Sequence, residues 1–158
     1  MISQFCKWLD ATPVSQTFQS LVWFVPTVQT VHILSIAVVM TSVGTLAGKL
    51  AGITGRDQAL ATMVSSIMPW VWCALAALLT TGLLLTVAEP SRELLNAAFR
   101  AKMLMVLAMV GILRLVQVRL REDPDYWGRR RAAAGGLGAA SLLLAVTIIV
   151  AGRWIAYI

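Results

Sequence analysis

Long apolar stretches separated by short polar ones dominate the pattern of this chain. Four stretches of roughly 20 residues have the length that a helix needs to cross the hydrocarbon core of a bilayer. They cover about residues 21–47, 65–88, 97–118 and 135–157. Little chain remains outside them. The pattern therefore predicts an all-α fold, a single transmembrane domain over residues 1–158 built as a polytopic membrane four-helix bundle.

The segment before the first stretch mixes aromatic, charged and polar side chains. Residues 2–19 include Phe5, Trp8, Lys7 and Asp10, a combination typical of a helix that lies in the membrane interface. Asp10 and the polar residues around it are also unlike a cleavable signal peptide. We therefore expect a short N-terminal interfacial helix in a chain that keeps its first residues.

The polar residues between the second and third stretches predict a helix boundary. Ser91 is the expected N-cap of the next helix, because its hydroxyl can accept from a free backbone N–H. Glu89, at the end of the second stretch, is expected to form an ion pair with Arg92, Lys102 or Arg153. We expect both features to be structural.

The composition agrees with a chain surrounded by lipid, and the distribution of its charges predicts the orientation of the chain in the membrane. Of 158 residues, 59% are hydrophobic and 13% charged, the mean hydropathy is +0.81 and the net charge is +6. The positive-inside rule makes the loops after the first and third stretches cytoplasmic and puts both termini outside. These loops are expected to contact membrane lipids, and no nucleic acid, because no soluble surface remains. The basic residues of these loops are Lys49, Arg56, Arg119, Arg121, Arg129, Arg130 and Arg131.

His32 is the only histidine of the chain and lies within the first stretch. It is about 11 residues from the outer end of that stretch, or about 16 Å deep at ~1.5 Å per residue. An ionisable side chain at this depth is a functional-site hypothesis. Gln29 and Ser35 lie three residues before and after it and share its helical face. They form a polar stripe with the histidine.

A cationic cluster is expected above His32 at the outer end of the bundle. Arg100 and Lys102 begin the third stretch, and Arg153 lies near the end of the fourth. A neutral imidazole can bind a haem iron while cations near the interface pair with the propionates. The structural alternative is that His32 donates to a carbonyl of a neighbouring helix, Lys102 extends to the surface and the arginines bind lipid phosphates.

Several short stretches resemble known membrane families. One set comprises Thr81-Gly82-Leu83-Leu84-Leu85, Ala88-Glu89-Pro90 and Asn96-Ala97-Ala98-Phe99-Arg100-Ala101-Lys102. With these stretches the chain resembles an uncharacterised family of bacterial four-helix integral membrane proteins. The resemblance covers most of the chain and implies a multi-pass protein of the bacterial inner (cytoplasmic) membrane. More distantly, Val31-His32-Ile33-Leu34 and Lys102-Met103-Leu104-Met105-Val106 are similar to the membrane-bound protoporphyrinogen oxidase and the copper resistance protein D-like haem bundles.

The distant resemblance implies a cofactor and a function. In the oxidase family the matching histidine and lysine are the essential residues and haem is bound. Carried over, His32 is the metal ligand of haem b and Lys102 the second catalytic residue, in electron transfer or in oxidation of a porphyrin- or quinone-like substrate. Without a second histidine, a sixth iron ligand must come from Met, Lys, water or a second copy. The candidate cofactor-binding residues are His32, Gln29, Ser35, Arg100, Lys102 and Arg153.

Glycine spacing supports an alternative function. Gly44, Gly48 and Gly52 recur at every fourth position, a pattern typical of close helix packing in membranes, within the bundle or across a dimer interface. Gly135, Gly136 and Gly138 can act in the same way in the fourth stretch. The alternative is a non-catalytic membrane subunit or homo-oligomeric scaffold or ligand-binding bundle without a cofactor. For either function we expect a homo-oligomer or a subunit of a larger membrane complex.

Sulfur-containing residues add little to the functional hypotheses. Met103, Met105 and Met109 are possible thioether ligands for haem or Cu(I), but methionine also fills irregular apolar gaps. Cys6 and Cys73 lie far apart in the sequence, so no disulfide or zinc site is predicted. Cys73 is expected to be a small buried residue. Because no familiar catalytic or nucleotide-binding motif is present, whether the chain is an enzyme stays open.

Overall fold

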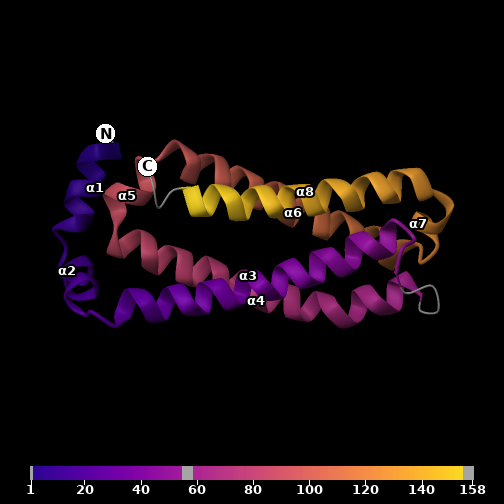
Figure 1. Cartoon of the computed structure of the whole chain (residues 1–158), viewed down its shortest axis with the longest axis horizontal. Helices are drawn as coiled ribbons and strands as arrows, with labels where there is room; N and C mark the ends of the chain where they lie inside the picture. Colours follow the sequence, from indigo (N-terminus) through magenta and orange to yellow (C-terminus); the bar gives the residue numbers. More distant parts are fainter. Residues whose placement is uncertain (1, 55–58, 155–158) are drawn as a thin grey trace.

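Helices make up the computed structural model, which describes residues 2–54 and 59–154. No strand occurs in these ranges (Figure 1). The prediction of an all-α fold is therefore confirmed. The helices are α1 (Ile2–Asp10), α2 (Pro13–Ser20), α3 (Phe24–Leu50), α4 (Leu60–Ala88), α5 (Pro90–Leu94), α6 (Ala97–Glu122), α7 (Tyr126–Arg129) and α8 (Arg131–Trp154).

Helices α3, α4, α6 and α8 are each long and apolar enough to cross a membrane, as the sequence predicted. Their polar ends extend beyond the apolar stretches. Helix α4 begins at Leu60, and α6 continues to Glu122 with Arg119 and Arg121 in its last turn, where cations favour the negative end of the helix dipole. Residues 155–157 of the expected fourth span lie outside the described residues.

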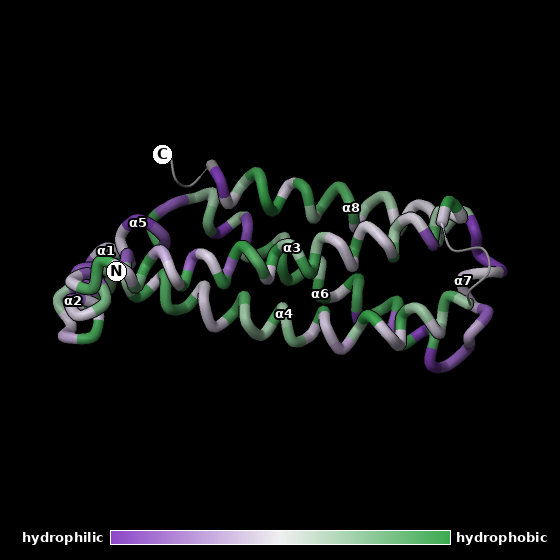
Figure 2. Tube along the Cα trace, turned by 60° about the horizontal axis from the view of Figure 1, so that its bottom comes forward, coloured by the Kyte–Doolittle hydropathy of each residue, from purple (hydrophilic) through white to green (hydrophobic). Residues whose placement is uncertain are grey.

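Apolar side chains cover the outside of the bundle. Leu79, Leu83, Leu104, Leu107 and Leu143 are each at least 59% exposed although they lie in the middle of long helices. Figure 2 shows the same distribution, with hydrophobic colours along the helices and hydrophilic ones concentrated at the two ends. A surface of this kind suits lipid rather than water. The chain is a multi-pass membrane protein.

The bundle has two distinct ends. The terminal end carries α1, α2 and α5 and the last turns of α8, and the loop end carries α7 (Figure 1). Helix α3 packs against both α4 and α8, and α6 packs against α8, whereas α4 and α6 make few contacts with each other. The helices therefore follow the order α4, α3, α8, α6, and the bundle is least closed between α4 and α6.

The buried core occupies the half of the bundle nearest the loop end. Gly138 of α8 lies directly on α3: a Cβ added there would be 3.0 Å from the Ala47 carbonyl oxygen. The predicted close approach of the fourth span is confirmed at Gly138, whereas Gly135 and Gly136 have open space beside them. The buried core residues are Val43, Leu46, Leu50, Met63, Val64, Met68, Val71, Met109, Leu113, Val116, Leu120, Trp127, Ala134 and Ala145.

The glycines of α3 do not pack against another helix of the bundle, which corrects one of the two predictions made for them. A Cβ on Gly44 would meet nothing within 4 Å, and one on Gly48 would meet the Thr54 hydroxyl at 2.9 Å. Gly52 has a φ of +73°, and Ile53 N–H donates to the Gly48 carbonyl at 2.9 Å. This geometry is a Schellman motif that ends α3. Gly48 and Gly52 therefore form a helix terminus.

The N-terminal segment forms two helices rather than one. Thr12 caps α2 by accepting from Ser15 N–H, and Pro13 occupies the first turn, where its missing N–H costs little. Buried Cys6 on α1 lies with its Sγ 3.7 Å from the Pro90 carbonyl oxygen. The two helices are thus packed on the end of the bundle, while Trp8 remains exposed and available to the membrane interface.

Two local predictions are wrong. Ser91 is not the N-cap of α6; it lies inside α5, which Pro90 begins, and Asn96 caps α6 by accepting from Ala98 N–H at 2.8 Å. Proline is preorganised for a first helical turn, so it starts the extra helix. Cys73 is exposed on α4 rather than buried. Both cysteines are free.

Candidate functional site

His32 forms a hydrogen bond to the neighbouring helix in the half of the bundle nearest the terminal end. It is partly buried on α3, about 12 Å along the helix from Phe24 at ~1.5 Å per residue. Its Nδ1 lies 2.7 Å from the Oγ1 of Thr81, a buried residue of α4. The two spans are thus joined by one polar contact inside an apolar bundle.

The Thr81 hydroxyl determines which nitrogen of the imidazole carries the proton. Thr81 Oγ1 lies 2.6 Å from the carbonyl oxygen of Ala77, to which it donates. A hydroxyl has one proton, so it accepts from His32, and Nδ1 carries the hydrogen of the neutral ring. The lone pair of Nε2 remains for a ligand. A histidine that donates through one nitrogen is prepared to coordinate through the other.

Two glycines give the functional side chains room. A Cβ on Gly82 would lie 3.7 Å from His32 Cε1, so the ring lies against α4 where no side chain intervenes. A Cβ on Gly152 of α8 would lie 3.3 Å from Lys102 Nζ. Lys102 of α6 therefore extends along α8, and its charge acts on the His32 ring. The side chains of three helices approach one another here.

Glu93 of α5 joins this group from the terminal end. Burial raises the pKa of its carboxyl, and the nearby Lys102 ammonium and Arg92 guanidinium oppose that rise. Lys102 in turn interacts electrostatically with Glu93. Glu93, Lys102, His32 and Thr81, which we call the polar line, connect the terminal end to the middle of the bundle.

The remaining predicted site residues differ from the polar line in burial or in hydrogen-bond partners. Ser35 is buried, and its hydroxyl donates to the Val31 carbonyl of its own helix at 2.9 Å. Gln29, Arg100 and Arg153 are exposed. Of the expected cationic cluster, Lys102 alone extends inside the bundle among these described residues. In the described ranges no group of three or more His, Cys, Asp and Glu side chains is placed to hold a metal ion.

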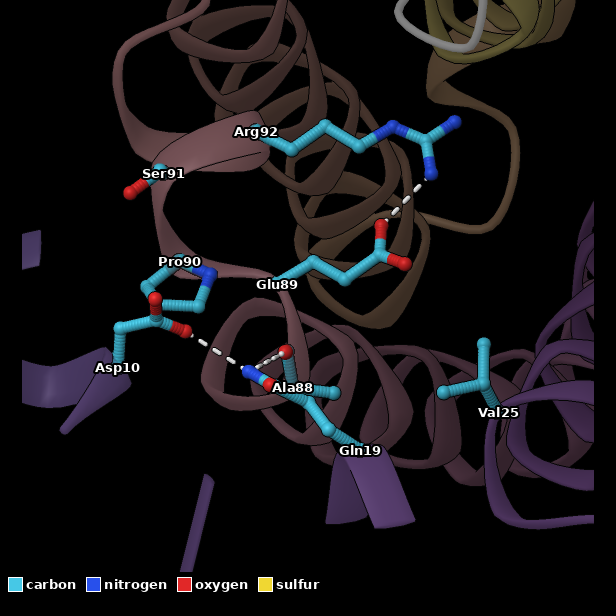
Figure 3. Close-up of a pocket in the computed structure, with 8 residues that line it drawn as sticks. All are labelled: Asp10, Gln19, Val25, Ala88, Glu89, Pro90, Ser91 and Arg92. Atoms are coloured by element: carbon cyan, nitrogen blue, oxygen red, sulfur yellow. Dashed lines mark hydrogen bonds and ion pairs between the residues drawn. The ribbon is translucent and has the colours of Figure 1, made fainter. Parts of the chain in front are cut away.

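A cavity lies where the N-terminal helices meet α4 and α5, and its lining ends at Arg92, next to Glu93 in the chain. It has a volume of about 440 Å³. Gln19 Nε2 donates to Asp10 Oδ1 at 2.7 Å and to the Ala88 carbonyl at 3.0 Å, and Arg92 pairs with Glu89 at 2.7 Å (Figure 3). The Glu89–Arg92 pair confirms the ion pair expected from the sequence. These contacts fasten α2 to the end of α4.

Sequence reasoning missed Thr81 and Glu93 as site residues. Thr81 precedes Gly82 within the second apolar stretch, and such a polar–glycine pair is a usable signal for a side chain approaching from another helix. Glu93 gave no comparable signal, because its burial depends on the short helix α5, which the sequence pattern did not predict.

Comparisons with known proteins identify the family of this chain. A search of the curated proteins and a search of the solved structures found no match. The model of DUF6644, a family of unknown function, matches residues 12–158. The match begins at the cap of α2 and includes every membrane-spanning helix and the whole polar line. The chain therefore belongs to DUF6644.

Proposed function

We propose that this protein binds haem b through His32 and acts in electron transfer or in the oxidation of a porphyrin- or quinone-like substrate. One observation carries the proposal: the Thr81 hydroxyl occupies the Nδ1 side of the ring, which leaves the Nε2 lone pair for an iron. The resemblance of the His32 and Lys102 stretches to the membrane-bound protoporphyrinogen oxidase supports it. Haem, when bound, supplies one-electron chemistry at its iron.

The residues of the polar line fit this cofactor. Thr81 fixes the tautomer and the orientation of the imidazole, as second-sphere partners of metal-binding histidines do. Lys102 is the cation that would pair with a propionate, and Glu93 holds the lysine by attraction. The absence of a side chain at Gly82 lets the His32 ring lie close to α4. By the positive-inside rule we place this site in the outer half of the bacterial inner membrane.

Visible absorption of the detergent-purified protein tests the proposal. The host is supplied with a haem precursor, and spectra are recorded as isolated and after dithionite. We expect a Soret band with reduced-minus-oxidised features, lost in His32→Ala because the chain has no other imidazole. Ser35→Ala is the matched control, since it removes a polar group of the same helical face. A colourless but helical wild-type protein, or full haem retention in His32→Ala, would overturn the proposal.

Lys102 is tested through haem affinity. We expect Lys102→Gln to retain haem with weaker affinity, because the iron ligand stays and the propionate loses a cation. Arg100→Gln removes a charge from the same turn of α6 but from an exposed position, so it should leave the affinity unchanged. Equal haem affinity in the two variants would remove Lys102 from the site.

A second candidate is the homo-oligomeric membrane subunit without a cofactor. The open space beside Gly44 supports it, because a small residue on the outside of α3 permits close approach of another helix. Gly44→Leu is then expected to change the oligomeric mass measured by light scattering in detergent. An unchanged mass would argue against this candidate, while Gly135→Leu controls for added bulk at another open site.

A further inference from the structure

A second cavity, unrelated to the polar line, opens between α4 and α6 near the loop end. Its volume is about 420 Å³, and we call it the α4–α6 groove. It lies on the side where the bundle is least closed. Its lining residues are Ala61, Val64, Ser65, Met68, Pro69, Trp72, Gln117, Leu120 and Arg121.

The two walls of the groove differ in chemistry. Ser65, Met68 and Trp72 lie at helical spacing along one face of α4. Met68 and Trp72 give an apolar and aromatic wall, and Ser65 lies at its loop-end edge. Gln117 and Arg121 lie at the same spacing along α6, and the exposed Arg114 lies one turn further from the loop end. The groove therefore combines an apolar side with a cationic, hydrogen-bonding side.

Arg114 is held beside the groove by contacts to Trp72 and Gln117. Its guanidinium lies 5.6 Å from the centre of the Trp72 ring, and its Nη1 lies 3.4 Å from Gln117 Oε1. Trp72 Nε1 donates to the same oxygen at 3.3 Å. Among the residues that the structure describes, no carboxylate forms a salt bridge with Arg114. Arg119, by contrast, pairs with Glu122 at 3.2 Å.

Arg114 lies near the loop-end boundary of the apolar stretch of α6. It is exposed and lies four residues before residue 118, where that stretch ends, or about 6 Å at ~1.5 Å per residue. A cation at this level extends toward the anions of the membrane surface. The groove beside it is open toward the bilayer, whose own anions are lipid phosphates.

Pro69 adds a hydrogen-bond acceptor to the α4 wall. A proline has no N–H, so the carbonyl of Ser65, four residues earlier, lacks its donor within the helix. The Ser65 hydroxyl itself donates to the Thr62 carbonyl at 2.8 Å. The groove thus offers acceptors for a hydroxyl as well as cations for a phosphate.

We propose that the α4–α6 groove binds an anionic phospholipid that carries a head-group hydroxyl. Its phosphate lies between Arg114 and Arg121, its hydroxyl donates to the acceptors of Ser65, and its acyl chain runs past Trp72 toward the middle of the bilayer. Charge complementarity, the opening toward the bilayer and the apolar wall select this occupant over a soluble anion.

Quenching of Trp72 by brominated lipids tests the proposal on the full-length protein in mixed micelles. Phosphatidylglycerol and phosphatidylcholine brominated on the acyl chain are compared, and the Trp72 signal is the difference between the wild type and Trp72→Phe. We expect phosphatidylglycerol to quench at a lower mole fraction than phosphatidylcholine. Arg114→Gln and Arg121→Gln should each weaken phosphatidylglycerol binding about fivefold, the effect of one basic residue near the membrane surface.

Arg119→Gln is the matched control, because it removes the same charge from the same end of α6 but breaks an ion pair with Glu122. It should leave the lipid preference unchanged. Equal quenching by the two lipids, or unchanged binding in both groove variants, would overturn the proposal. So would release of the lipid by inorganic phosphate at constant ionic strength, which would identify a soluble anion as the occupant. If Trp72→Phe does not fold, native mass spectra replace the quenching measurement. The fraction of protein that retains phosphatidylglycerol is then compared between the wild type and Arg121→Gln.

Discussion

The two halves of the bundle are built differently. Toward the loop end, Leu46, Leu113 and Val116 are at most 1% exposed, and α8 touches the backbone of α3 at Gly138. Toward the terminal end, the interior holds the ionisable and hydroxyl groups of the polar line. The first half is held by packing and the second by a few polar contacts, so substitutions should affect stability in one and ligand chemistry in the other.

This difference has a physical reason. In a bilayer, lipid removes the hydrophobic drive between helices, so association depends on van der Waals contact and on interhelical hydrogen bonds. The closely packed half supplies most of the buried apolar contact between the helices. The other half is then free to keep polar groups that would be costly in a core responsible for stability.

Gly138→Leu is expected to have the largest effect on stability. The new side chain meets the Ala47 carbonyl at the closest approach of α8 to α3, and overpacking of this kind costs about 3 kcal/mol. Thermal unfolding in detergent, followed by circular dichroism, measures the loss. Gly136→Leu enters open space and serves as the control; equal melting temperatures would show that the loop-end half is not the tightly packed one.

Leu113→Ala is expected to follow. In a lipid environment the apolar side chain gains little from being transferred out of its surroundings. The loss of unfolding free energy therefore comes mainly from the cavity that the substitution leaves, about 2 kcal/mol. Leu104→Ala on the same helix removes the same atoms from a side chain that is 69% exposed, so its unfolding transition should stay close to that of the wild type. A larger loss at Leu104 than at Leu113 would reverse the comparison between core and lipid-facing surface.

Thr81→Val should have a smaller effect on stability. The variant leaves His32 Nδ1 without its partner, and a hydrogen bond between membrane helices contributes about 1 kcal/mol. Thr80→Val is a close control, because Thr80 is exposed and its hydroxyl donates only to Ala76 of its own helix. The free energy of unfolding in detergent separates the two; identical values would mean that the His32–Thr81 contact contributes nothing.

Glu93 should give the smallest effect, visible as a pH dependence. Because burial raises the pKa of its carboxyl above the ordinary value of 4.5, the folded state binds this proton more tightly than the unfolded state. Its contribution to stability is present below the ordinary pKa and is lost as the pH rises through the raised one.

Glu93→Gln should remove that decline in melting temperature above pH 4.5, and the exposed Glu122→Gln should keep it. A decline of the same size in Glu93→Gln protein would assign it to another group.

The spanning helices could be predicted from the sequence because their apolar stretches are far longer than any other pattern in the chain. His32 and Lys102 were predicted as site residues because ionisable residues stand out in apolar stretches, and their role in a site stays a prediction. Thr81 was harder to recognise, because a threonine in a spanning helix usually bonds its own backbone, and its partner on α3 emerges only from the packing of the helices. The burial of Glu93 depends on α5. That short helix begins at Pro90, and the hydrophobic periodicity of the sequence did not predict it.

Glycine spacing was the least reliable guide. Gly48 and Gly52 follow the four-residue repeat but form a helix terminus. The close contact between α8 and α3 is made by Gly138, which lies in a glycine cluster without that repeat. Spacing reports which residues share a face but not which face meets a neighbour. That information lies in the order of helices around the bundle.

The unequal exposure of the two cysteines makes the native chain suitable for site-selective labelling. Cys73 is exposed on α4, whereas Cys6 is buried against α5. A maleimide spin label should therefore react at Cys73 alone in folded protein, with no engineered thiol. Its accessibility to oxygen and to a water-soluble relaxation agent would then measure the depth of α4 in a reconstituted bilayer.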